Sequence, residues 1–290
     1  MRREAFWAYL MIAPTGLGLL VFYLYPILRT LYFSFTDWGA FGSYEWTGLE
    51  NYSQLLADEA VRGALRNTFL YSFLVLLGIP LSIAVAALLN TKGLRGVGLY
   101  RTLYFLPVVT MPVAVAIVWQ WIYNGDFGIL NFLLSRVGID GRYWLADPDT
   151  ALLALGVVGV WMTLGYNVVI LLAGLQGIPA HYYEAAEIDG AGPLRRFFSI
   201  TVPLLSPSIF FVTVLTLIHA LQVFDLVFVL IEPTNPARPR AQSVVDLFYR
   251  QAFVENDRGY AAAIVMSLLV VILVMTLVQF RLQKRWVHYE

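Results

Sequence analysis

Long apolar stretches without charge alternate with short charged segments along this chain. Six stretches of at least 22 residues contain no Asp, Glu, Lys or Arg. Since a helix rises about 1.5 Å per residue, about 20 apolar residues cross the hydrocarbon core of a bilayer. The stretches also lack the two-residue alternation of a membrane-barrel strand. The pattern therefore predicts an all-α membrane protein, a single transmembrane domain whose six transmembrane helices cover residues 5–28, 67–91, 102–125, 150–178, 203–225 and 259–281.

A cleaved signal peptide is the alternative for the first stretch, because Arg2 and Arg3 resemble the basic start of such a peptide. The apolar run is too long for that class of segment, and it continues through Tyr25 and Pro26. We therefore expect residues 5–28 to be a retained helix.

The positive charges predict an orientation. An even number of spans puts both termini on one side of the membrane, and ten of the 19 basic residues fall in the four short segments of that side. The other nine are spread over three longer segments, so the positive-inside rule makes the first side cytoplasmic. The ten residues are Arg2, Arg3, Lys92, Arg95, Arg101, Arg195, Arg196, Arg281, Lys284 and Arg285.

The last outer segment has two parts. Its first part contains Pro233, Pro236 and Pro239, which argue against a regular helix there. Arg238 and Arg240 lie in the same part, and we expect them to be solvated, with contact to a protein partner on the outer side as the alternative. Residues 242–257 follow with apolar side chains at helical spacing, which predicts a short amphipathic helix.

Composition excludes several classes of protein. Hydrophobic residues make up 59% of the chain and charged residues 13%, whereas soluble domains have about 45–50% and about 25%. The chain is therefore neither a water-soluble globular protein nor a disordered one. Its net charge is zero, so no global field attracts nucleic acid. The absence of cysteine excludes disulfides, iron–sulfur clusters and thiol catalysis.

The motifs of membrane enzymes and ion-driven carriers are missing from the sequence. No Walker A pattern occurs, and the three histidines lack the spacing of a zinc site. The six charge-free stretches contain no carboxylate of the kind that proton-driven carriers use. We therefore expect a non-catalytic chain without a metal or a cofactor of its own. A membrane enzyme acting on lipid or glycan, or a secondary carrier, remains the alternative.

The segment between the fourth and fifth spans is the most informative one. Pro179 suits the start of a helix, residues 180–189 form a short amphipathic one, and Gly190 can adopt the positive φ that ends it. Ala185 and Ala186 are small enough to let another surface approach. The segment is therefore predicted to dock into a partner on the cytoplasmic side, although an ordinary solvated loop would also explain each feature singly.

This segment resembles the EAA loop of ABC-importer permeases. The sequence has Glu184-Ala185-Ala186, three residues, Gly190, nine residues, Ile200, one residue, and then Val202-Pro203. The family pattern has Leu where this chain has Val202. The resemblance implies a type I ABC-importer permease fold, in which the loop 179–202 carries a coupling helix that inserts into an ATP-binding subunit.

The resemblance extends over nearly the whole chain. Residues 67–72, 101–124 and 280–290 look like the carbohydrate-importer branch, in particular the first permease subunits of glycerol-3-phosphate and maltose-type systems. Residues 233–236 depart from it, because relatives commonly have a Gly-Gly-Pro turn there.

That branch implies the function and the partners. The chain is expected in a bacterial cytoplasmic membrane, with both termini cytoplasmic, as half of the pathway of an ATP-driven sugar or sugar-phosphate importer. Its expected partners are a second, homologous permease, two ATP-binding subunits that hold ATP and Mg, an extracytoplasmic solute-binding protein, the lipid bilayer and a sugar, but no nucleic acid.

Two sets of site residues follow. For coupling to the ATPase, the resemblance implies Glu184, Ala185, Ala186, Asp189 and Gly190. For the solute pathway, helical spacing puts Thr163, Tyr166 and Asn167 on one face of the fourth span and Thr216, His219 and Gln222 on a stripe of the fifth. The resemblance adds Trp161, and it also matches Thr163, Tyr166, Thr216 and His219 to positions that line the sugar site. Hydrogen bonding between helices is the alternative role for these side chains. Since His219 is the only potential cation in the spans, a neutral saccharide is favoured, but the partner permease could supply the charge for a phosphate-bearing solute.

Overall fold

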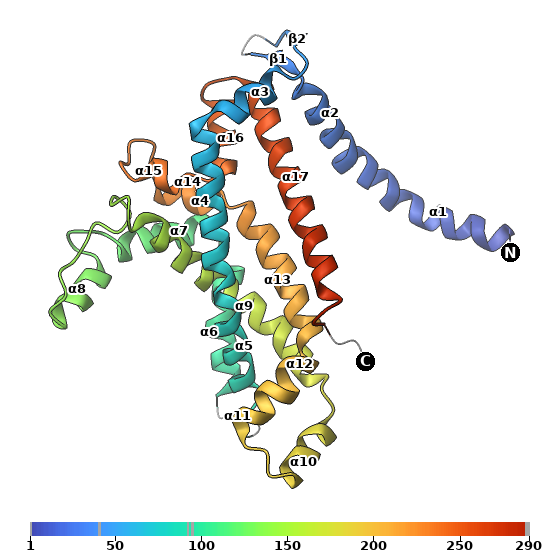
Figure 1. Ribbon diagram of the computed structural model, residues 1–290, viewed down its shortest axis with the longest axis vertical. Helices are drawn as coiled ribbons and strands as arrows, with labels where there is room; N and C mark the ends of the chain where they lie inside the picture. The colour runs from blue at the N-terminus through green and yellow to red at the C-terminus, as the bar shows by residue number, and fades with distance from the viewer. Residues whose placement is uncertain (1, 40–41, 92, 94–95, 288–290) are drawn as a thin grey trace. The chain divides into compact units, whose positions relative to one another are not determined.

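The computed structural model describes residues 2–39, 42–91, 93 and 96–287, and these residues are predominantly helical, as the sequence predicts. Lys92 and Arg95 lie outside the described residues. The chain divides into two compact units, Met1–Arg62 with Leu247–Val270, and Gly63–Asp246 with Val271–Glu290. Figure 1 labels the elements of both units. The organisation as a single transmembrane domain stays a prediction.

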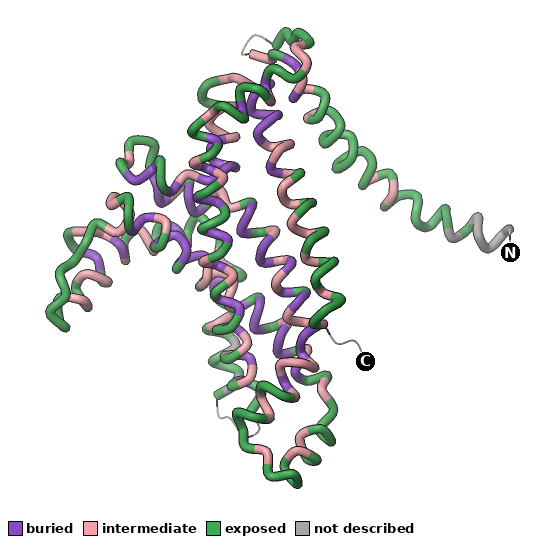
Figure 2. Tube along the Cα trace, viewed as in Figure 1, coloured by how far each residue is buried: buried purple, intermediate pink, exposed green. Residues whose placement is uncertain are grey.

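An unbroken apolar helix opens the first unit. It consists of α1 (Arg2–Leu19), the π-helical turn η1 (Leu20–Leu24) and α2 (Tyr25–Phe33). The part Tyr9–Phe33 is long and apolar enough to cross a membrane, and its most apolar window has no buried residue. Figure 2 shows this exposure along the helix. A helix that is apolar on all sides suits contact with lipid, and its retention stays a prediction.

A small sheet and a short helix follow. β1 (Thr36–Trp38) pairs antiparallel with β2 (Tyr44–Trp46), with Thr36 opposite Trp46. α3 (Glu50–Ala57) comes next. None of these three elements is predicted from the sequence, because each is much shorter than the charge-free apolar stretches from which helices are predicted.

Asn51 on α3 ties this part of the first unit together. Its buried Nδ2 donates to the carbonyl oxygens of Ser34 (3.0 Å) and Thr36 (2.9 Å). An Asn51→Asp variant is expected to lose about 1–3 kcal/mol of stability, because a carboxylate cannot donate and repels both carbonyls. Ser53→Asp adds the same charge at an exposed position of the same helix and is the control. Equal midpoints in thermal unfolding of the two purified variants would contradict this role.

The remaining long helices account for the other predicted spans. Among the described residues, four helices are long and apolar enough to cross a membrane, and six when each of two bent helix pairs counts as one span. The count is consistent with six predicted spans. Besides Tyr9–Phe33, the unbent candidates are α4 (Glu59–Leu76) with α5 (Gly78–Leu89), α9 (Ala151–Gln176) and α17 (Arg258–Gln283).

The two bent pairs break where proline limits the helix. α6 (Val97–Val109) and α7 (Pro112–Ile122) are bent by more than 40°. The segment Pro193–Leu204 bends by 66° into α13 (Ser206–Leu221). Proline is tolerated in the first turn of a helix, where Pro112 lies, but it cannot continue a preceding one. The sequence predicts one continuous span over residues 102–125, and a loop over 179–202 before the span 203–225, so neither bend is predicted.

Short helices complete the chain. They are α8 (Ile129–Arg136), α10 (Ala180–Ile188), α11 (Pro193–Arg196), the π-helical turn η2 (Phe197–Thr201), α12 (Val202–Leu204), α14 (Asp225–Leu230), α15 (Arg238–Ala241) and α16 (Val244–Phe253). α16 lies where the sequence predicts an amphipathic helix. α15 corrects the expectation of no regular helix around Pro239, because this proline occupies the first turn.

α9 is the centre of the second unit. α5, α6 and α13 all pack against it, and Figure 2 shows buried residues along α9 and α13. Gly165 lets α6 approach closely: a Cβ added there would lie less than 3.0 Å from the backbone carbonyl oxygen of Tyr104. Small residues commonly permit such backbone contact between membrane helices.

Candidate functional site

A cavity of about 500 Å³ lies in the second unit. α4, α9 and α13 line it, together with the break between α6 and α7 and the turn that joins α13 to α14. Non-helical backbone at membrane depth is tolerated where protein buries it or where it lines a cavity. The interrupted helices therefore mark the place at which this fold can hold a polar solute.

The cavity brings together six of the seven predicted pathway residues, from both α9 and α13. They are Thr163, Tyr166, Asn167, Thr216, His219 and Gln222. Trp161 is the exception, because it is not among the lining residues. Its ring instead packs edge-on against Trp119 on α7, with 5.8 Å between the ring centres.

Asn167 and Thr216 link α9 to α13 inside this cavity. The Thr216 hydroxyl donates to Asn167 Oδ1 over 3.3 Å, and both side chains are buried. Asn167 Nδ2 is also buried, with no hydrogen-bond partner in the described part of the chain. A buried amide donor without a partner costs free energy, so a ligand oxygen at this position would be stabilised.

The other predicted groups differ in what they offer. Thr163 donates to the Gly159 carbonyl oxygen over 2.9 Å, which uses its proton within α9 and leaves its oxygen as an acceptor. Tyr166 is 40% exposed, and His219 and Gln222 are also exposed. Aromatic, imidazole and amide groups thus meet around one space.

Further residues that are not predicted from the sequence line the cavity, among them Tyr71, Met162, Phe224 and Asp225. Asp225 could have been noticed in the sequence, because it is the first charged residue after a stretch of 28 residues without charge. The turn after Leu221 brings it to the cavity instead of leaving it in an outer loop. Tyr71 and Met162 had no signal beyond membership of a predicted span.

The lining favours some solutes over others. Among the described residues, no group of three or more His, Asp or Glu side chains could hold a metal ion. Asp225 brings a carboxylate to the lining, and among the described lining residues His219 is the only one whose side chain can become cationic. An anionic solute would therefore meet little compensating charge from this chain, whereas hydroxyl groups would find donors and acceptors.

The predicted coupling helix is present as α10. Its end is a Schellman motif: the Ala191 amide donates to the Ala186 carbonyl over 2.8 Å, and the Gly190 amide to the Glu187 carbonyl over 3.0 Å. Gly190 has φ of +72°, the positive value that the sequence predicts. Pro179 precedes the helix in an extended conformation as its N-cap.

α10 presents a free surface in the isolated chain. Glu184, Ala185, Asp189 and Gly190 are exposed, and Ala186 is half-buried. The neighbouring Ile188 is 88% exposed, which is unusual for a large apolar side chain on a capped helix. Small, acidic and apolar groups thus share one accessible face.

Two contacts join α10 to the helical turns that precede the fifth predicted span. The hydroxyls of Tyr183 and Thr201 share a hydrogen bond of 3.0 Å. Arg196 forms an ion pair with Glu187 over 3.2 Å. The sequence analysis assigns no such role to Tyr183, because its partner is 18 residues away. α10 is therefore attached to the following helices by side chains as well as by the backbone.

Interrupted membrane helices around a cavity with polar side chains in a largely apolar wall, and a capped helix on the loop that joins two of the lining helices, define the chain as a membrane permease. The family of binding-protein-dependent transport system inner membrane components matches residues 63–288. The chain belongs to this family.

Relatives and solved structures agree with this membership. The chain is 36% identical to the probable ABC transporter permease protein YesP of Bacillus subtilis (strain 168), covering all of this chain and 94% of that protein. It is 34% identical to the sn-glycerol-3-phosphate transport system permease protein UgpA of Agrobacterium fabrum, covering 97% and 96%. The structure also resembles a chain of a bacterial alginate ABC transporter in complex with an alginate pentasaccharide-bound periplasmic protein, with a TM-score of 0.86, 26% identity, and 98% and 96% of the two chains covered. The fold is thus that of an ABC-importer permease.

Proposed function

We propose that this chain is one of two permease subunits of an ATP-driven, binding-protein-dependent sugar importer. The observation that carries the proposal is the cavity between α9 and α13, where six predicted pathway residues converge. The solved transporter named for alginate, a polysaccharide, supports the carbohydrate class, and the relative named for sn-glycerol-3-phosphate supports a solute rich in hydroxyl groups. Both of these solutes are anionic, so the preference for a neutral solute rests on the cavity of this chain. The two alternatives, a membrane enzyme and a secondary carrier, have no counterpart among these relatives.

The solute of this importer is a neutral saccharide. Thr216, His219, Gln222 and the Asn167 amide offer hydrogen bonds to hydroxyl groups, and Tyr166 offers an aromatic face. Sugars need both, because their C–H faces stack while their hydroxyls require partners. The Asp225 carboxylate disfavours a phosphate group in the same space.

α10 is the element that couples the chain to an ATP-binding subunit. Its exposed Glu184, Ala185 and Ile188 give a partner both a charge and an apolar surface. Gly190 and Asp189 shape the end of the helix, and the half-buried Ala186 permits close approach. In this assignment the ATP-binding partners hold ATP and Mg, and this chain is non-catalytic.

The remaining partners follow from the same assignment. A second, homologous permease completes the pathway and a solute-binding protein docks outside, as in the solved complex with a periplasmic protein. The chain crosses a bacterial cytoplasmic membrane with α10 and both termini on the cytoplasmic side, the orientation that the ten basic residues of the short segments favour.

A screen of neutral saccharides tests this function. The complex is reconstituted with its binding protein, and ATP hydrolysis is measured as a function of the saccharide concentration. Thr216→Val is expected to raise the half-saturating concentration by about 5- to 50-fold, because it removes a hydroxyl from the cavity and the partner of Asn167. Thr213→Val is the matched control, since this threonine bonds only to the Ile209 carbonyl of its own helix.

Two results would contradict the proposal. One is the failure of every saccharide to stimulate ATP hydrolysis above the level without solute. The other is an equal shift for the variants at Thr213 and Thr216, which would mean that the cavity side of α13 does not meet the solute.

A further inference from the structure

A buried ion pair lies in the segment Arg238–Asp246, where it joins the start of α15 to the first turn of α16. Arg238 Nη2 lies 2.5 Å from Asp246 Oδ2, and the two side chains are only 8% and 0% exposed. This corrects the expectation that Arg238 is solvated. Burying two charges costs several kcal/mol per ion, which the pair offsets only with additional hydrogen bonds. The hydrogen-bond partners of the two residues therefore identify the elements that the ion pair keeps in place.

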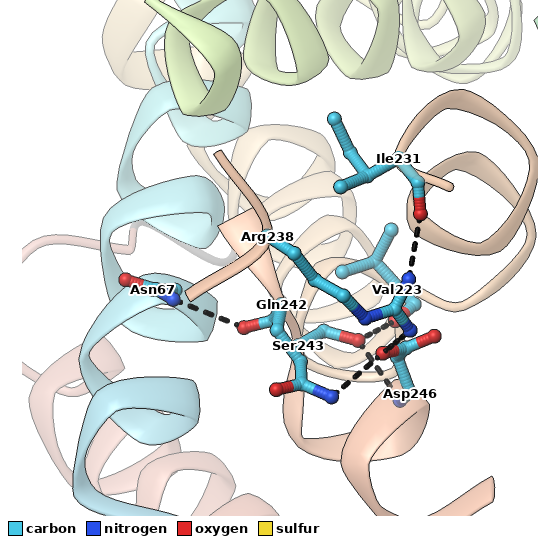
Figure 3. A network of polar contacts seen from close by, with 7 residues as sticks. All are labelled: Asn67, Val223, Ile231, Arg238, Gln242, Ser243 and Asp246. Atoms are coloured by element: carbon cyan, nitrogen blue, oxygen red, sulfur yellow. Dashed lines mark hydrogen bonds and ion pairs between the residues drawn. The ribbon is translucent and has the colours of Figure 1, made fainter. Parts of the chain in front are cut away.

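Those partners connect the pair to both ends of α14 (Figure 3). Arg238 Nη1 donates to the Ile231 carbonyl over 2.7 Å. The Asp246 amide donates to Ser243 Oγ over 3.1 Å, and this hydroxyl donates to the Val223 carbonyl over 2.7 Å. Ile231 follows the last residue of α14 and Val223 lies just before its N-cap. Carbonyls at helix ends need such external donors.

The same segment is fixed to α4. Asn67 Nδ2 donates to the carbonyl oxygens of Pro239 (3.0 Å) and Gln242 (3.1 Å). The Val244 amide donates to Thr68 Oγ1 over 3.0 Å. Gln242 also reaches Asp246 Oδ2 through its side chain over 2.9 Å. α14 is thus connected through the ion pair to a long membrane helix.

α14 forms part of the cavity wall. Asp225 and Leu226, its first residues, line the cavity, and Val227 and Leu230 are buried in the adjoining core. A helix of six residues has little stability of its own, since isolated helices shorter than about 12 residues are marginal in water. Its position must come from its surroundings.

We propose that Arg238 and Asp246 are positioning residues: their ion pair clamps α14 against α4 and so fixes one wall of the cavity. The statement that this wall matters for transport rests on the proposed function. The clamp itself is tested without a solute, so its failure and the failure of the proposed function are distinguishable.

The chain contains no cysteine, which makes single thiol probes specific. Val227→Cys reports on α14, because Val227 is 1% exposed, and Val158→Cys reports on the core of α9, where Val158 is 0% exposed. Each probe is introduced into the full chain, which is co-expressed with its partner subunits, and the rate of maleimide labelling is measured in membranes.

Asp246→Asn is expected to speed labelling of Val227→Cys about tenfold, because it leaves Arg238 charged and buried without its counterion. Labelling of Val158→Cys should stay slow. Asp246→Glu restores the charge and is expected to change the rate at Val227→Cys by no more than about twofold. Asp149→Asn, which breaks the exposed ion pair of Asp149 with Arg240 in the same region, is the matched control and should change neither rate.

If Asp246→Asn accumulates poorly, Arg238→Lys is used in the same labelling experiment. A single ammonium group cannot reach both Ile231 and Asp246 as the guanidinium does. Faster labelling at Val227→Cys alone supports the clamp. Slow labelling at both probes, or equally faster labelling at both, overturns it.

Discussion

A Gly165→Val variant is expected to assemble poorly, with a loss of about 3–5 kcal/mol of stability or no recoverable complex. The reason is the approach of α6 to α9: any Cβ at Gly165 would lie less than 3.0 Å from the Tyr104 carbonyl oxygen, and backbone cannot move aside as a flexible side chain can. The measurements are the amount of chain in the membrane and the thermal unfolding midpoint of the purified complex.

Gly98→Val is the control for this prediction. It makes the same change within α6, at a position where an added Cβ would have no atom of the described residues within 4 Å. Similar losses for the two variants would mean that helix propensity, and not the contact with Tyr104, determines the result.

A Gly190→Val variant is expected to reduce solute-stimulated ATP hydrolysis by about tenfold or more, because a β-branched residue is strained at a φ of +72°. The Schellman motif that ends α10 would have to rearrange, which moves the surface proposed to meet the ATP-binding subunit. The stability of the isolated chain should change little, since the loop is exposed.

The neighbouring glycine gives this prediction its control. Gly192 has φ of −66° and ψ of 167°, values that valine adopts readily, and an added Cβ there would meet no atom within 4 Å in the part of the chain that the structure describes. Gly192→Val should therefore retain most activity. The activity of Gly190→Asn should lie between those of the two valine variants, since asparagine tolerates positive φ better than other residues with a side chain. Equal activity of the two valine variants would contradict the role of the cap.

The sequence predicts the long elements well because their signal is local. Charge-free runs of more than 20 residues correspond to α9 and α17 with small errors at their ends. The positive φ of Gly190 was likewise predictable, because a helix followed by glycine has few ways to end. In both cases the physical cause lies within a few residues of the effect.

The bends and the buried ion pair were not predictable in the same way. An apolar run looks the same whether it is straight or interrupted, so the break between Leu221 and Asp225 is invisible in the composition. Arg238 in a proline-containing outer loop looks solvated, and only the folded positions of Asp246 and Ile231 reveal its burial. The sequence spacing of Trp161 likewise says nothing of Trp119, which holds its ring away from the cavity.

The hydrogen bond between Tyr183 and Thr201 gives the loop that carries α10 a second connection besides the backbone. Because it attaches α10 to the turn before α12, a displacement of α10 would move that turn with it. If α10 meets an ATP-binding subunit as proposed, the 66° bend between Leu204 and Ser206 would convert such a displacement into a tilt of α13 and of the polar side chains it carries. Two hydroxyl groups would then determine how much of that subunit's motion reaches the cavity.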